Sequence, residues 1–221
     1  MLLSEKLFLI GIDDKSMKFS LKSDKYLFFG AVIMDLILKE MIILEGKKNN
    51  EIQIIDENLT EINLLDLTLN NIKKIKATSK EFPSLSEIYD TFQYEKIRNM
   101  IVSRLELMGI IKYLGKKNLS RRYQILIMEE KKQVLNDLQE GIGYTVERDQ
   151  SNFKDLISLL SLLNVNANNK SIVGWRKLKK NKWLKNYVKK EPIGNWLKKQ
   201  IKKEKHEMLI EDWNGDDDFI V

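Results

Sequence analysis

The side chains of this 221-residue sequence that could do chemistry are mostly cations, because the usual catalytic groups are scarce. There is no cysteine, so no thiolate nucleophile, thiolate metal site or disulfide can form. The single histidine, His206, stands in a lysine-rich segment without a serine or cysteine partner at a catalytic spacing, which favours a surface histidine over a general base. No glycine-rich phosphate loop occurs, and the acidic run at 212–218 lacks the glycine and closing glutamate of a calcium loop. The sequence therefore predicts a protein that is not an enzyme and needs no cofactor or metal.

The cations are concentrated near the end of the chain. Residues 171–206 hold thirteen lysines and arginines against two acids, whereas residues 207–221 hold six acids and no base. Since the net charge is +6, the first 170 residues are nearly neutral. A concentrated basic block attracts phosphate-rich partners, which are anionic membrane lipids or nucleic acid. A solvated helix face without a charged ligand is the alternative, as in a scaffold whose basic block folds against the acidic tail.

One basic stretch, residues 193–201, repeats apolar side chains at helical spacing and includes Trp196. Such a helix can lie in a membrane interface with its tryptophan at headgroup depth. The alternative, which we favour, is that the apolar stripe packs onto the domain and the lysines face water. The candidate membrane-surface residues are Trp196, Lys198, Lys199, Lys202 and Lys203.

Hydrophobic periodicity predicts a mostly α-helical single domain with short β-hairpins to position these residues. The expected helices are 2–12, 26–41, 64–75, 85–92, 94–108, 130–138, 153–163 and two basic helices on either side of Glu191 and Pro192. The expected hairpins join 42–44 to 51–55 and 110–114 to 122–126, and a short strand is expected at 18–21. The first of the long helices, 26–41, is apolar almost all round, which is typical of a buried central helix.

We divide the chain into a helical core (1–170), basic C-terminal helices packed on the same domain (171–206) and an acidic tail (207–221). The N-terminus meets acidic residues too early for a signal peptide, and no apolar run reaches the roughly 20 residues that span a bilayer. We therefore expect a cytoplasmic protein.

The helix at 94–108 ends at Gly109 and leads into a hairpin whose tip, 115–121, is cationic. A winged-helix DNA-binding protein has the same order of elements, so nucleic acid is the alternative partner. The helix carries only three basic residues, however, whereas a helix that binds in the major groove usually has more polar side chains along the face that meets the DNA. They are Lys96, Arg98 and Arg104.

Several stretches, in their order and spacing, resemble the Golgi phosphoprotein 3 family over roughly residues 1–205. These stretches are 3–14, 30–44, 64–73, 104–123 and 191–201. The resemblance implies a single, mostly helical domain with a β-hairpin, peripheral on the cytosolic face of a membrane. Eukaryotic members recognise phosphatidylinositol 4-phosphate and hold glycosyltransferases in the Golgi, which implies anionic lipids and cytosolic tails of membrane proteins as partners. The lysine, asparagine and isoleucine bias is typical of an AT-rich genome and indicates a divergent or prokaryotic member.

The family's headgroup pocket combines one tryptophan with three arginines, and the resemblance assigns positions to them here. Arg98 matches one of two helix arginines, while Glu95 stands at the other position with Lys96 beside it. Phe29 replaces the third arginine, and the preceding loop offers Phe19 in place of the tryptophan. Because one surface cation contributes only about 1 kcal/mol, we expect salt-sensitive binding of acidic lipid rather than strict selectivity for one phosphoinositide. The candidate headgroup-binding residues are Arg98, Lys96, Lys116, Lys117, Arg121 and Arg122.

Overall fold

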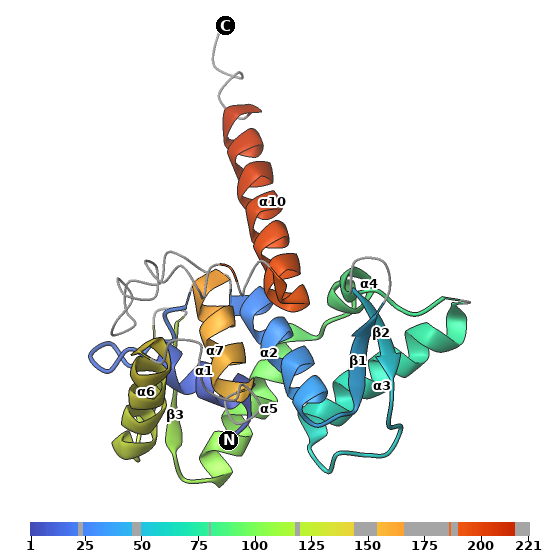
Figure 1. Cartoon of the computed structure of the whole chain (residues 1–221). Helices are drawn as coiled ribbons and strands as arrows, with labels where there is room; N and C mark the ends of the chain where they lie inside the picture. Colours follow the sequence, from blue (N-terminus) through green and yellow to red (C-terminus); the bar gives the residue numbers. More distant parts are fainter. Residues whose placement is uncertain are drawn as a thin grey trace, which may run out of the picture.

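The computed structural model describes residues 1–21, 24–45, 50–79, 81–117, 120–143, 154–165, 186 and 190–214. Its helices are α1 (Leu3–Gly11), α2 (Asp24–Leu38), α3 (Asn63–Thr78), α4 (Leu85–Asp90), α5 (Tyr94–Leu107), α6 (Met128–Gly143), α7 (Lys154–Val165) and α10 (Pro192–Asn214). Strands β1 (Ile42–Glu45) and β2 (Glu51–Ile54) form one antiparallel hairpin, and β3 (Ile111–Lys117) and β4 (Ser120–Ile125) form another (Figure 1). The predicted fold class, mostly α with short β-hairpins, is confirmed.

Some predicted boundaries differ from the observed ones. The second hairpin is longer than expected, because its strands continue to Lys117 and Ser120 instead of ending in a seven-residue tip. The strand expected at 18–21 is reduced to isolated bridges. Helix α10 continues through Asn214, so the first part of the acidic stretch 207–221 is helical. The first of the two basic helices expected after residue 171 lies outside the described residues.

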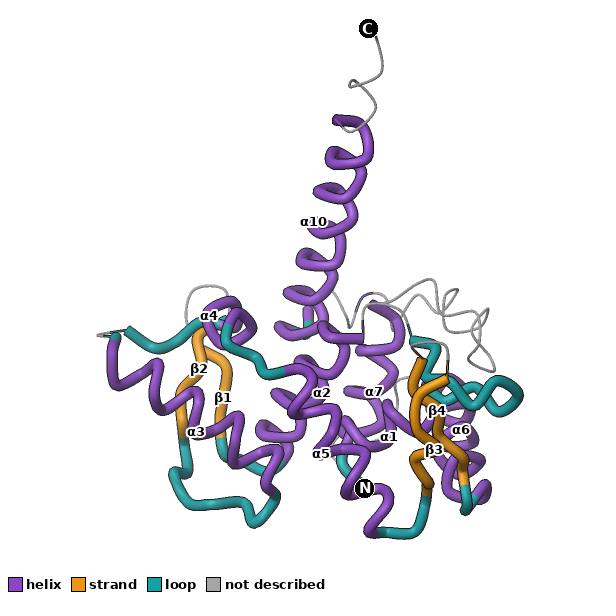
Figure 2. The backbone as a smooth tube through the Cα atoms, turned by 180° about the vertical axis from the view of Figure 1, so that it is seen from behind, coloured by secondary structure: helices purple, strands orange, loops and turns teal. Residues whose placement is uncertain are grey.

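Helix α2 lies at the centre of the fold, because its side chains are apolar almost all round. Helices α1, α3, α5, α7 and α10 pack against it (Figures 1 and 2). Gly30 makes the contact with α7 and α10 possible, since a Cβ at this position would lie 2.6 Å from Leu197 Cδ1 and 2.8 Å from Leu162 Cδ2. Close packing at Gly30 therefore fixes the position of the C-terminal helix on the core.

Asp35 of α2 is a buried carboxylate that holds the beginning of α1. It accepts hydrogen bonds from the backbone N–H of Leu3 at 2.7 Å, the N–H of Ser4 at 3.1 Å and the Ser4 hydroxyl at 2.9 Å. The two backbone N–H groups would otherwise be unsatisfied, because the first turn of a helix has no intrahelical acceptors for them. Burial raises the pKa of Asp35 to about 6 despite these bonds, and the nearby Glu5 adds to the rise. Glu5 is itself buried and accepts from Arg104 Nε at 2.5 Å, which ties α1 to α5.

The placement of Trp196 at a membrane surface is wrong. Its side chain is only 8% exposed, with the ring centroid 5.2 Å from that of Phe29, and its Nε1 donates to Ser86 Oγ at 3.1 Å. The indole is buried because it fills the space between α2 and α4, so the alternative of a stripe packed onto the domain is confirmed. The other buried members of this stripe are Ile193, Leu197 and Ile201.

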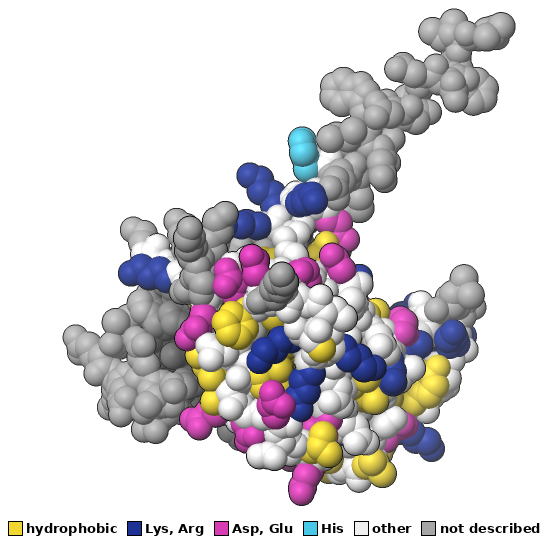
Figure 3. Space-filling view, turned by 90° about the vertical axis from the view of Figure 1, so that its right-hand side faces the viewer, with side chains coloured by type: hydrophobic (Ala, Val, Ile, Leu, Met, Phe, Trp, Pro, Cys, Tyr) yellow, Lys and Arg dark blue, Asp and Glu magenta, His cyan; other side chains and the backbone are white. Residues whose placement is uncertain are grey.

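The lysines of α10 lie on the opposite side of the same helix and are exposed. They are Lys198, Lys199, Lys202 and Lys203. Figure 3 shows basic side chains along α10 where it leaves the body of the protein.

None of the described helices has both the length and the apolar character needed to cross a membrane.

Candidate functional site

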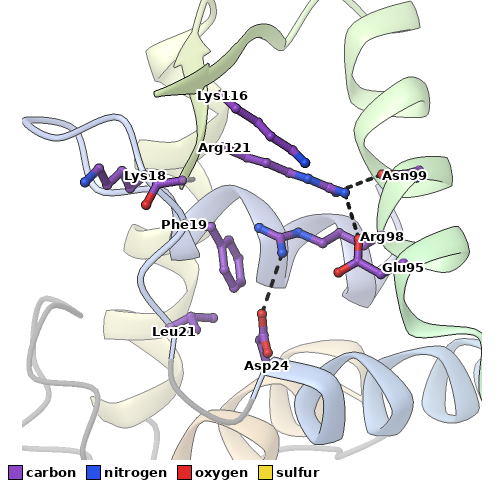
Figure 4. Close-up of a pocket in the computed structure, with 10 residues that line it drawn as sticks. Lys18, Phe19, Leu21, Asp24, Glu95, Arg98, Asn99, Lys116 and Arg121 are labelled. Atoms are coloured by element: carbon purple, nitrogen blue, oxygen red, sulfur yellow. Dashed lines mark hydrogen bonds and ion pairs between the residues drawn. The ribbon is translucent and has the colours of Figure 1, made fainter. Parts of the chain in front are cut away.

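An open cavity of about 670 Å³ lies between the β3–β4 hairpin, helix α5 and the loop that precedes α2 (Figure 4). The residues that line it are Lys18, Phe19, Leu21, Asp24, Glu95, Arg98, Asn99, Lys116, Ser120 and Arg121. Three of these side chains, Arg98 from α5, Lys116 from β3 and Arg121 from β4, bring positive charge toward one another (Figure 4). Lys18 lies at the edge, with its ammonium directed away from the two guanidinium groups.

Helix α5 supplies one wall through the spacing of its polar residues. Glu95, Arg98 and Asn99 stand three and four positions apart, which places them on one face of a helix. The other face holds α5 against the core through side chains that are buried. They are Ile97, Ile101, Val102 and Leu105. The wall is therefore presented by a helix whose rotation is fixed by apolar packing.

The hairpin supplies the opposite wall. Lys116 and Arg121 are directly paired across β3 and β4, so their side chains lie next to each other. The register is irregular between Tyr113 and Lys116, and Gly115 in that interval has a φ of +84°. Such bulges bend a strand and redirect its side chains. Because like charges opposite each other are unfavourable, an anion between Lys116 and Arg121 would stabilise this pairing.

The third wall is the loop between α1 and α2, which is held by backbone contacts. Tyr123 N donates to Met17 O at 2.8 Å, and Lys18 forms an isolated antiparallel bridge with Arg122. Phe19 stacks on Phe8 with ring centroids 5.1 Å apart. The loop therefore places the ring of Phe19 at a defined position beneath the hairpin.

Arg98 is the deepest of the three cations, with a side chain that is 14% exposed. Its guanidinium carbon lies 5.3 Å from the centroid of Phe19, within the range of a cation–π contact. Its Nη1 donates to the Tyr94 hydroxyl at 3.1 Å and lies 4.0 Å from Asp24 Oδ2, and the Tyr94 hydroxyl donates to Asp24. Burial and this hydrogen bond raise the pKa of Tyr94 above its usual value. Arg98 Nε is buried and has no hydrogen-bond partner among the described residues, which leaves one donor of a deep cation unused.

Arg121 is nearer the rim and is already engaged by α5. Its Nη1 donates to Asn99 Oδ1 and its Nη2 to Glu95 Oε2, both at 2.8 Å. Burial is the largest single effect and lowers the pKa of Arg121, but the Glu95 carboxylate together with Tyr123 and Tyr113 outweighs it, so the pKa is raised. The guanidinium therefore stays charged and is held by one neutral and one negative acceptor.

The structure separates the predicted headgroup residues into two groups. Arg98, Lys116 and Arg121 line the cavity, whereas Lys96, Lys117 and Arg122 do not. Phe19 lies in the cavity wall, but Phe29 faces the core against Trp196 instead. The α10 lysines do not line this cavity either.

Sequence reasoning missed several residues of the cavity. They are Lys18, Leu21, Asp24, Asn99 and Ser120. The spacing of Asn99 from Arg98 and Glu95 on α5 could have identified it. Asp24 meets Tyr94 across 70 positions of sequence, and no local pattern signals such a contact.

The chemistry available in this cavity is anion binding. Guanidinium and ammonium donors form strong charge-assisted hydrogen bonds with phosphate oxygens. The described residues include no group of three or more His, Asp or Glu side chains placed to hold a metal ion.

Comparison with known families gives an independent result. The model of a family described as Golgi phosphoprotein 3 (GPP34) matches residues 3–208. No curated protein matches the chain significantly. The matched range contains every element that lines the cavity and most of α10.

Proposed function

Because the chain belongs to the Golgi phosphoprotein 3 family, we propose that it is a non-catalytic adaptor that binds anionic lipid headgroups at the cytosolic face of a membrane. Phosphoinositides are among the headgroups that fit, since a phosphate monoester presents several acceptor oxygens to converging cations. Cytosolic tails of membrane proteins are the clients such an adaptor would hold.

The observation that carries this proposal is the convergence of Arg98, Lys116 and Arg121 on one open cavity (Figure 4). A single exposed cation contributes about 1 kcal/mol at a charged membrane surface. Three cations that face one space can act on the same phosphate, and the partial burial of Arg98 reduces its screening by solvent.

The geometry of α5 favours lipid over nucleic acid. Arg104 is engaged by the buried Glu5, and Arg98 lies against Phe19 below the rim. Of the three bases on this helix, Lys96 alone is exposed, which is few for a helix that would read a major groove.

The test is co-sedimentation of the full chain with phosphatidylcholine vesicles, alone or with phosphatidylserine or phosphatidylinositol 4-phosphate. The sedimentation is repeated over a series of salt concentrations and in the presence of duplex DNA as a competitor. We expect binding only to the anionic vesicles, weaker at high salt and not displaced by DNA. No binding to any vesicle, or capture of the protein by DNA, would contradict the proposal.

Neighbouring lysines provide a matched pair of variants. Lys116 lines the cavity and Lys117 does not, although both are exposed on the same strand. We expect Lys116→Ala to weaken binding to phosphatidylinositol 4-phosphate vesicles about fivefold, the equivalent of about 1 kcal/mol, with a smaller effect on phosphatidylserine vesicles. Lys117→Ala should affect both vesicles equally, because it changes only the general surface charge.

A further inference from the structure

The cavity contains an acidic side chain in direct contact with one of its own cations. Glu95 Oε2 lies 2.8 Å from Arg121 Nη2, the distance of a charge-assisted hydrogen bond. A carboxylate oxygen and a phosphate oxygen use the same donor atoms of a guanidinium in the same geometry. Glu95 therefore occupies a donor of Arg121 that a bound phosphate would need.

The other acid of the cavity differs from Glu95 in its surroundings. Asp24 accepts from the Tyr94 hydroxyl and faces the deep Arg98, so it belongs to the framework that positions that cation. The Glu95 side chain is 61% exposed at the rim, and among the described residues its carboxylate is bonded to Arg121 alone. Its carboxylate can rotate into solvent without breaking a further contact.

We propose that Glu95 is an internal competitor for phosphate monoesters: its carboxylate neutralises Arg121 in the free protein and must leave when the ligand enters. This inference rests on the proposed function and adds a residue that sets its affinity and selectivity. A headgroup with one diffuse negative charge gains little by displacing Glu95. A phosphate monoester carries more charge and more acceptor oxygens, so it competes better for Arg121.

Two effects of Glu95 on affinity can be separated. The carboxylate competes for Arg121, and it also repels any anion nearby. Only the competition depends on Arg121, so a double-mutant cycle between Glu95 and Arg121 isolates it.

The experiment uses Glu95→Gln, Arg121→Ala and the double variant of the full chain. Glu81→Gln serves as the matched control, because Glu81 is an exposed acid that does not line the cavity. Binding is measured with phosphatidylcholine vesicles containing phosphatidylinositol 4-phosphate and, separately, with soluble inositol 1,4-bisphosphate. The first probe tests a lipid source of the phosphate and the second a free one. Thermal unfolding of each variant confirms that it folds.

We expect Glu95→Gln to tighten binding of both probes about five- to tenfold, the scale set by losing one exposed ion pair and one repulsive charge. Glu81→Gln should leave the affinity unchanged. In the Arg121→Ala background the gain from Glu95→Gln should shrink to the part due to repulsion alone.

Failure of this inference differs from failure of the proposed function. Suppose that the unmodified chain binds vesicles and that Arg121→Ala weakens this binding. If Glu95→Gln then leaves the affinity unchanged or lowers it, the competitor role is overturned and the lipid function stands. An equal gain from Glu95→Gln with and without Arg121 would also overturn it. If neither the unmodified chain nor Glu95→Gln binds any of these probes or the phosphatidylserine vesicles, the proposed function itself is overturned. Binding of phosphatidylserine vesicles alone would overturn only the competitor role, because no phosphate monoester would then be bound.

Discussion

Replacing Asp35 with asparagine should flatten the pH dependence of stability between about pH 4 and pH 6. The pKa of this carboxyl is 3.8 in an unfolded chain and about 6 in the folded protein, where burial disfavours its charge. Between these values the folded protein keeps the proton and the unfolded chain has released it. The free energy of unfolding therefore falls as the pH rises through this range, because the folded state binds more protons than the unfolded state.

The size of the effect follows from the two pKa values. The difference between 3.8 and about 6, at 1.36 kcal/mol per pKa unit, corresponds to about 3 kcal/mol in the free energy of unfolding. This stabilisation is fully present below pH 3.8, is lost as the pH rises to about 6 and stays lost above it. Solvent screens it little, because Asp35 is 3% exposed.

Urea unfolding of the wild type and of Asp35→Asn across pH 3.5 to 8 measures this difference. The asparagine oxygen can still accept one of the bonds from Leu3 and Ser4, so the variant also differs by an offset that does not depend on pH. Only the difference in slope is diagnostic, and the ¹³C shift of the Asp35 carboxyl should titrate near pH 6. Parallel curves for the two proteins would refute the reasoning, since they would mean that burial does not shift this group.

Three further outcomes follow from the packing and the charge distribution. Gly11→Ala should lower the free energy of unfolding by about 1–3 kcal/mol, measured with urea, and weaken vesicle binding, because the new Cβ would lie 2.4 Å from the ring of Phe19 in the cavity wall. Unchanged vesicle binding would show that the Phe19 ring can move without affecting the cavity. Trp196→Ala should lower the free energy of unfolding by about 3–5 kcal/mol, because the indole is buried. A decrease below about 0.5 kcal/mol, which is typical of a surface residue, would contradict that burial. Deleting residues 207–221 removes six acidic residues and no basic one, so we expect a larger fraction of the protein to sediment with anionic vesicles at low salt. An unchanged fraction would show that the acidic stretch does not mask the basic residues.

The helices and hairpins were predictable because their signals are local. The continuous apolar character of 26–41 indicated a central helix, and α2 is buried from Leu27 to Leu36. Gly109 was expected to end the helix at 94–108, and it follows α5 with a φ of +69°. Trp196 shows the limit of such patterns, since an amphipathic helix has the same spacing whether its apolar face meets lipid or a protein core.

The cavity was only partly predictable, because it joins segments that are distant in sequence. Charge alone could not distinguish Lys116 from Lys117 or Arg121 from Arg122. The alternation of side chains along a strand could have done so, but only once the register of the hairpin was known. Asp24 could not be assigned at all, because its partners Tyr94 and Arg98 are on another element.

Helix α2 links the two basic surfaces of the protein. Its first residue, Asp24, lies in the cavity, and Phe29, five residues later, packs against Trp196 of α10. Five residues of helix rise about 7.5 Å, so the base of α10 is attached close to the cavity and by buried contacts. The exposed lysines of α10 therefore keep a fixed position relative to Arg98. If both surfaces meet the same membrane, neutralising α10 lysines should reduce the salt dependence of binding without changing the preference among headgroups, whereas cavity variants should change that preference.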